Sequence, residues 1–132
     1  MNTKVVMTAS SISLGVIGIV FTFMPAEILH WVTLEAAKSL TLMVQILGAL
    51  YFSYAMLNWM SKGNLIGGIY NRPIAVANFT HYLIAALALI KGVTSIHNTP
   101  TLLLAMAILY CVFAIAFGLI LFRHPLPNKK TE

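Results

Sequence analysis

The sequence contains no Asp, and its only acidic residues are Glu27, Glu35 and Glu132. Acidic side chains orient the histidine of hydrolytic triads, and carboxylate-bridged metal sites need several of them, usually with two Glu-x-x-His pairs. Only one such pair occurs, Glu27 with His30. We therefore predict no catalytic residue, no metal site and no cofactor. The single cysteine, Cys111, also excludes an internal disulfide framework.

Charged residues of either sign are scarce. They make up 8% of the chain, against about a quarter in ordinary soluble domains, while 60% of the residues are hydrophobic. A soluble protein of 132 residues could not bury that much apolar surface, because the buried fraction of a chain grows with its size. The lipid bilayer is therefore a necessary partner. The basic residues are scattered singly apart from Lys129 and Lys130, so the net charge of +5 does not indicate nucleic acid binding.

Four long stretches lack every charged residue, namely Val5–Met24, Leu40–Met60, Pro73–Ile90 and Thr101–Phe122. At about 1.5 Å of rise per residue, a helix over each of them can cross a hydrocarbon core of about 30 Å. The backbone must satisfy its own hydrogen bonds in lipid, which favours helices. We predict one all-α transmembrane domain over residues 1–132, an up-down four-helix bundle. Its spans cover about 5–24, 40–60, 73–92 and 101–122, and a tail follows at 123–132.

A short helix is expected directly after the first span. Pro25 ends that span and suits the first position of a new helix, where Glu27 lies favourably near the positive end of the helix dipole. Trp31 is an aromatic residue of the kind that anchors segments at headgroup level. We predict that residues 25–32 form a helix lying in the membrane interface.

The positions of the basic residues predict the orientation. With four spans, the N-terminus, the middle loop and the C-terminus share one side of the membrane. Six of the eight basic residues lie on that side and two on the other. The six are Lys4, Lys62, Arg72, Arg123, Lys129 and Lys130, and the two are Lys38 and Lys91. Because cytoplasmic loops carry the excess of Lys and Arg, both termini and the tail are predicted to be cytoplasmic.

Polar side chains inside the second and third spans are the best site candidates, because burying them in lipid is costly. They are Tyr51, Tyr54, Asn58, Asn78, His81 and Tyr82, with Arg72 at the mouth between the two spans. At about 100° per residue, His81 lies about 60° from Asn78 on the third helix. Tyr54 and Asn78 are both roughly 7–9 Å from the cytoplasmic boundary, and Tyr51 and His81 about 12–14 Å. We therefore expect the two sets to face each other.

This polar cluster has three interpretations. Asn, His and Tyr commonly hydrogen-bond between membrane helices, and this structural role is the default. The same residues also suit a pocket for a small lipophilic molecule. Proton transfer through His81 is the third, because histidine titrates near neutrality, but no span contains a carboxylate partner. Small residues such as Gly18 and Gly48 predict close helix packing, within the bundle or with a second copy or a larger membrane complex.

Three short segments are similar to small bacterial four-helix membrane proteins of the DoxX-like kind and to related families of unknown function. They are Phe23–Glu27, Gln45–Tyr51 and Tyr70–Pro73. This resemblance implies a four-helix bundle in a bacterial inner membrane and brings no established activity. We expect a non-enzymatic accessory subunit or a bundle that binds a lipophilic molecule. The alternative is a small membrane enzyme or redox partner that uses the polar cluster.

Overall fold

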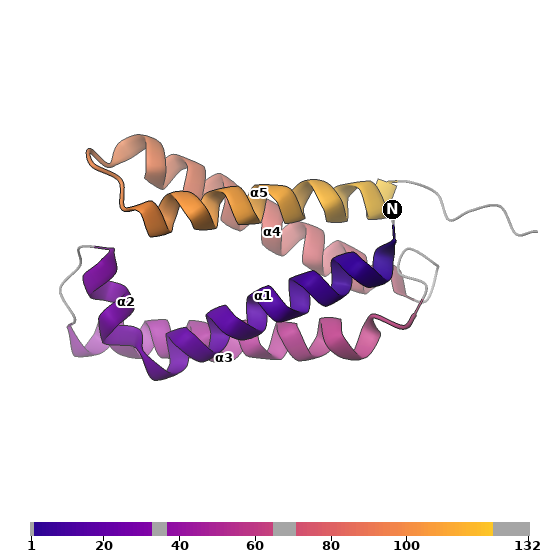
Figure 1. Ribbon diagram of the computed structural model, residues 1–132, viewed down its shortest axis with the longest axis horizontal. Coiled ribbons are helices and arrows are strands. Elements are labelled where there is room, and N and C mark those ends of the chain that lie inside the picture. The colour runs from indigo at the N-terminus through magenta and orange to yellow at the C-terminus, as the bar shows by residue number, and fades with distance from the viewer. Residues whose placement is uncertain (1, 33–36, 65–70, 123–132) are drawn as a thin grey trace, which may run out of the picture.

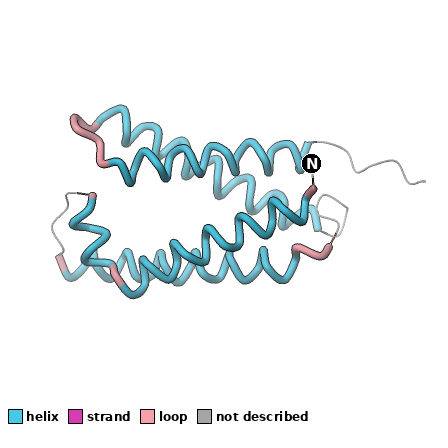
Figure 2. Tube along the Cα trace, in the orientation of Figure 1, coloured by secondary structure: helices cyan, strands magenta, loops and turns pink. Residues whose placement is uncertain are grey.

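The computed structural model describes residues 2–32, 37–64 and 71–122, which form five α-helices (Figure 1). The helices are α1 (Thr3–Phe23), α2 (Pro25–Trp31), α3 (Lys38–Ser61), α4 (Arg72–Ser95) and α5 (Thr101–Phe122). Figure 2 shows turns and loops between them, and no strand occurs in the described ranges. The predicted fold class is confirmed: the protein is all-helical, with four long apolar helices and a short helix after the first.

Three helices include charged residues that flanked the charge-free runs. α1 includes Lys4, α3 begins at Lys38, and α4 begins at Arg72 and continues through Lys91 to Ser95. Long basic side chains lay their aliphatic stems along the helix and keep their charge at headgroup level. A Lys or Arg near the end of a span therefore does not end the helix. The runs without charge locate the membrane core of each helix rather than its ends.

Proline residues mark the starts of three helices. Pro25 is the first residue of α2, Pro73 is the second residue of α4, and Pro100 directly precedes α5. The missing N–H of proline costs nothing in the first helical turn, where that group has no partner within the helix. α1 begins differently, because the side chain of Asn2 accepts a hydrogen bond of 3.1 Å from the backbone N–H of Lys4.

The short helix α2 has one buried and one exposed face. Ile28 and Leu29 are buried against the bundle, whereas Glu27, His30 and Trp31 are exposed. Figure 1 shows α2 turning away from the direction of α1 at the end of the bundle opposite the N-terminus. Its residues agree with the helix predicted over 25–32. Glu35, predicted to lie on the same side of the membrane, falls outside the described residues.

The four long helices form two antiparallel hairpins, α1 with α3 and α4 with α5 (Figure 1). One end of the molecule, which we call the N-terminal end, holds the first residues of α1 and α4 and the last residues of α3 and α5. α2 and the loop between α4 and α5 lie at the opposite end. This up-down course agrees with the prediction that the N-terminus and the middle loop share one side.

Within the first hairpin, α1 and α3 approach until their backbones touch. A Cβ added to Gly18 would lie 2.7 Å from the backbone nitrogen of Phe52, and one added to Gly48 would lie 2.8 Å from the carbonyl oxygen of Gly18. The hydroxyl of Ser11 donates a hydrogen bond of 2.6 Å to the carbonyl oxygen of Ala55 on α3. These small residues therefore serve packing inside the bundle.

Large apolar side chains cover the outside of the long helices. Phe23 and Phe122 at helix ends are 78% and 73% exposed, and Ile115 within α5 is 65% exposed. Apolar surface this extensive is stable only against lipid or another apolar partner. All four long helices also have the length and composition to cross a membrane. The chain is a multi-pass integral membrane protein with four candidate spans, and its orientation stays a prediction.

Candidate functional site

A buried hydrogen-bond network joins the two hairpins near the N-terminal end. Asn58 of α3 donates through Nδ2 to Oδ1 of Asn78 on α4 at 2.7 Å, and Asn78 donates back through Nδ2 to Oδ1 of Asn58 at 2.8 Å. Asn58 also donates to Oγ of Ser10 on α1 at 2.9 Å, and the hydroxyls of Ser10 and Tyr82 lie 2.7 Å apart. All four side chains are buried. We call these four residues the amide network.

Both asparagines in the amide network are fully satisfied. The second N–H of Asn78 donates to the carbonyl oxygen of Ile74 at 2.9 Å, one turn back on α4. Each amide oxygen therefore accepts one hydrogen bond and each amide nitrogen donates two. A network with no free donor offers nothing to a ligand but resists separation of the helices. These contacts are of the kind that the default interpretation, a structural role, requires; the role itself stays a prediction.

His81 lies beside the amide network but takes no part in it. Its imidazole is surrounded by tyrosine rings from three helices, at centroid distances of 5.1 Å to Tyr54, 5.2 Å to Tyr82, 5.5 Å to Tyr51 and 5.7 Å to Tyr110. The Tyr54 ring is stacked on the imidazole, and the rings of Tyr51 and Tyr82 meet it edge-on. The histidine is therefore fixed by aromatic packing.

Two polar atoms in this aromatic cluster are buried without a hydrogen bond. They are Nε2 of His81 and the hydroxyl oxygen of Tyr110. No described residue forms a hydrogen bond with the other ring nitrogen of His81, Nδ1, either. Unpaired buried polar groups are rare in folded proteins, because each costs about 1–3 kcal/mol. The imidazole of His81 thus has hydrogen-bonding capacity that the protein leaves unused.

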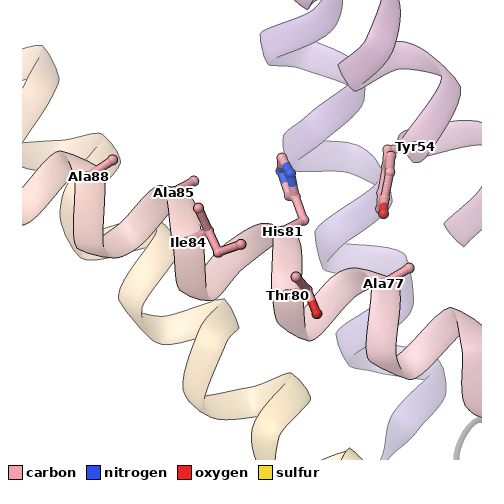
Figure 3. Close-up of a pocket in the computed structure, with 7 residues that line it drawn as sticks. All are labelled: Tyr54, Ala77, Thr80, His81, Ile84, Ala85 and Ala88. Atoms are coloured by element: carbon pink, nitrogen blue, oxygen red, sulfur yellow. The ribbon is translucent and has the colours of Figure 1, made fainter.

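An open groove with a volume of about 530 Å³ runs beside His81 along α4. Its lining comprises Tyr54 from α3 together with Ala77, Thr80, His81, Ile84, Ala85 and Ala88 from α4. Figure 3 shows the imidazole projecting from α4 toward the first hairpin, with the Tyr54 ring beside it. The short side chains of the three alanines leave space between the larger residues on this face of α4. The groove is open on one side and does not enclose its contents.

The structure brings most of the predicted site residues together and divides them by role. Asn58 and Asn78 face each other across α3 and α4, which confirms that the polar sets of the two helices meet. Tyr54 and His81 line the groove, and Tyr51 and Tyr82 pack around His81. Whether any of them binds a ligand stays a prediction.

Arg72 lies outside the groove, and the structure adds two residues that the sequence did not predict. Arg72 is the first residue of α4; it is exposed and does not line the groove. Ser10 and Tyr110 were not predicted. A Tyr or Ser within an apolar run is a weak signal, yet Tyr110 is the only tyrosine of the fourth span, and Ser10 adjoins a second serine of the first span, Ser11.

Charge and metal-ligating groups are sparse around the groove. None of its lining residues is Lys, Arg, Asp or Glu. Within residues 2–32, 37–64 and 71–122, no three His, Cys, Asp or Glu side chains converge in the manner of a metal site. Glu27 and His30 lie on α2 at the far end of the bundle. The groove therefore offers a few hydrogen-bonding side chains within an otherwise apolar lining.

Comparisons with protein-family models, with curated proteins and with solved structures find no match to this chain. The resemblance to DoxX-like proteins therefore remains a prediction.

Proposed function

We propose that this protein is a non-enzymatic membrane component that binds a lipophilic small molecule in the groove between α3 and α4. The groove is apolar along most of its length, opens on the outside of a transmembrane helix, and holds one imidazole without a partner. A ligand dissolved in the bilayer reaches such a groove without crossing water.

The unpartnered imidazole of His81 is the observation that carries this proposal. A histidine that only joined helices would hydrogen-bond to a neighbouring helix, as Asn58 and Asn78 do. Instead, neither ring nitrogen of His81 has a partner among the described residues. Nε2 is enclosed by protein atoms, so a ligand oxygen or N–H in the groove would bond to Nδ1, which has no partner among the described residues. In a site without bulk water, that hydrogen bond adds affinity and fixes the orientation of the ligand.

The test compares the protein with a His81→Phe variant. Phenylalanine keeps an aromatic ring among the tyrosines but removes both nitrogens, so packing is retained. Both proteins are extracted from native membranes and analysed by native mass spectrometry, followed by identification of bound small molecules. A His97→Phe variant is the matched control, because His97 is an exposed residue of the loop between α4 and α5.

We expect a bound small molecule in the wild-type protein and the His97→Phe variant, and its loss from His81→Phe at an unchanged melting temperature. Equal retention in all three proteins, or no bound molecule in any of them, would contradict the proposal.

A further inference from the structure

The polar side chains of the groove beside His81 lie in the half nearer the start of α4, where Ala77 also lies, and the other half has only apolar side chains. We call these halves the polar end and the apolar end. Tyr54, Thr80 and His81 form the polar end, toward the start of α4, and no described residue hydrogen-bonds to the side-chain hydroxyl of Tyr54 or Thr80. Ile84 and Ala88 form the apolar end. From Ala77 to Ala88 the helix rises about 16 Å at 1.5 Å per residue, so the groove is about that long.

The side of the groove facing away from the bundle is open. At the apolar end, Ile84 is 62% exposed, and Ala88 is also exposed. In a membrane-spanning helix, an exposed apolar side chain faces lipid tails. A chain-shaped ligand can therefore enter sideways from the bilayer and lie parallel to α4.

Charged groups stand away from the polar end. Arg72 precedes Thr80 by eight residues, or about 12 Å along the helix axis. At the other end, Lys91 follows Ala88 by about one helical turn and is exposed. An ionised head group at His81 would thus lie in the membrane with no Lys or Arg of the described residues beside it, which is costly. An anionic amphiphile would place its head at Lys91 and leave His81 without a partner.

We infer that the ligand is a neutral single-chain amphiphile. Its head group is small and carries a hydroxyl or similar hydrogen-bonding group that bonds to the imidazole of His81, while its chain lies along Ile84 and Ala88. This inference rests on the proposed function and specifies the chemical class and the direction of the ligand. Phospholipids with charged head groups are excluded from the polar end by the same argument.

Three probes with the same chain separate the head-group classes: 1-dodecanol is neutral and polar, dodecane has no head, and dodecanoate is anionic at mildly alkaline pH. The full chain, labelled with ¹⁵N-histidine and with ¹³C in the alanine methyl groups, is placed in phosphatidylcholine nanodiscs. Each probe is added at the same mole fraction of lipid. The His81 signals are identified by their loss in His81→Phe.

We expect 1-dodecanol to shift the His81 nitrogen signals and the Ala88 methyl signal saturably. Dodecane should shift only the methyl signal, and dodecanoate should leave the nitrogen signals unchanged. One hydrogen bond between groups in a membrane corresponds to roughly 3- to 30-fold tighter binding of dodecanol than of dodecane. Ala88→Leu, which fills the apolar end, should weaken dodecanol binding. Ala49→Leu, on an exposed alanine of α3 outside the groove, should not.

Each contrary outcome has a distinct meaning. Equal affinity for dodecane and dodecanol, with methyl shifts only, overturns the head-group bond but leaves a lipophile-binding groove. A nitrogen shift with dodecanoate as large as with dodecanol overturns the neutral head. If no probe gives a saturable shift while native extracts still yield a bound molecule lost in His81→Phe, the ligand class is wrong and the proposed function stands. If neither experiment detects a ligand, both fail.

Discussion

Replacing Asn78 by Leu removes half of the amide pair that joins the two hairpins. Leu has the branching of Asn, so the change removes polarity with little change of shape. Asn58 then loses two hydrogen-bond partners on Asn78: the N–H donor 2.8 Å from its Oδ1 and the oxygen acceptor 2.7 Å from its Nδ2. Its second N–H still donates to Ser10. Two of its three hydrogen bonds disappear in a site that is fully buried.

The structure sets the size of the effect. An unpaired buried polar group costs about 1–3 kcal/mol, whereas hydrogen bonds between membrane helices average only about 0.6 kcal/mol when the partner is removed as well. We therefore expect Asn78→Leu to lower the free energy of unfolding by about 2 kcal/mol, and Asn58→Leu to do the same. The double variant leaves no unpaired amide. Its cost should fall short of the sum of the single costs by about 1–2 kcal/mol, because contacting residues are not additive.

The measurement is reversible unfolding of the four proteins in mixed micelles, followed by circular dichroism or by steric trapping. Ser53→Ala serves as a control, because the exposed Ser53 bonds only to the carbonyl oxygen of Ala49 in its own helix and should have little effect. Strictly additive costs, or single variants as stable as the wild type, would show that the amide pair does not hold the hairpins together.

Two further predictions concern packing and orientation. In the same unfolding assay, Gly48→Ala should destabilise the protein by about 1–3 kcal/mol, because the new Cβ would lie 2.7 Å from the backbone nitrogen of Thr22. Gly92→Ala is the control: a Cβ there would meet no neighbouring atom within 4 Å, so the change should be neutral or stabilising. A reporter fused to the C-terminus should be active only as a cytoplasmic enzyme, and Glu27→Cys should react with a membrane-impermeant maleimide from the outer side. Alkaline phosphatase activity at the C-terminus, or labelling of position 27 only after lysis, would reverse the orientation.

The four spans and the meeting of α3 with α4 followed from the sequence. A span is a local property, since length and the absence of charge decide it without reference to the rest of the chain. The facing of Asn58 and Asn78 was also predictable, because a short connection makes two helices antiparallel and equal depth then brings their polar residues level. The short helix after Pro25 was predicted from the placement of Pro25, Glu27 and Trp31.

The division of the polar cluster into a structural network and an unpartnered histidine was decided by the tertiary structure. Helical periodicity gives the face of α4 on which His81 lies and its depth in the membrane. It does not give the rotation of α4 relative to α1 and α5, and this rotation determines whether Ser10 or an aromatic ring contacts that face. Ser10 and Tyr110 come from spans distant in sequence, and only the packing of the two hairpins places them beside Tyr82 and His81. The groove arises in the same way, because the alanines of α4 form one of its walls only where Tyr54 of the other hairpin lies beside them.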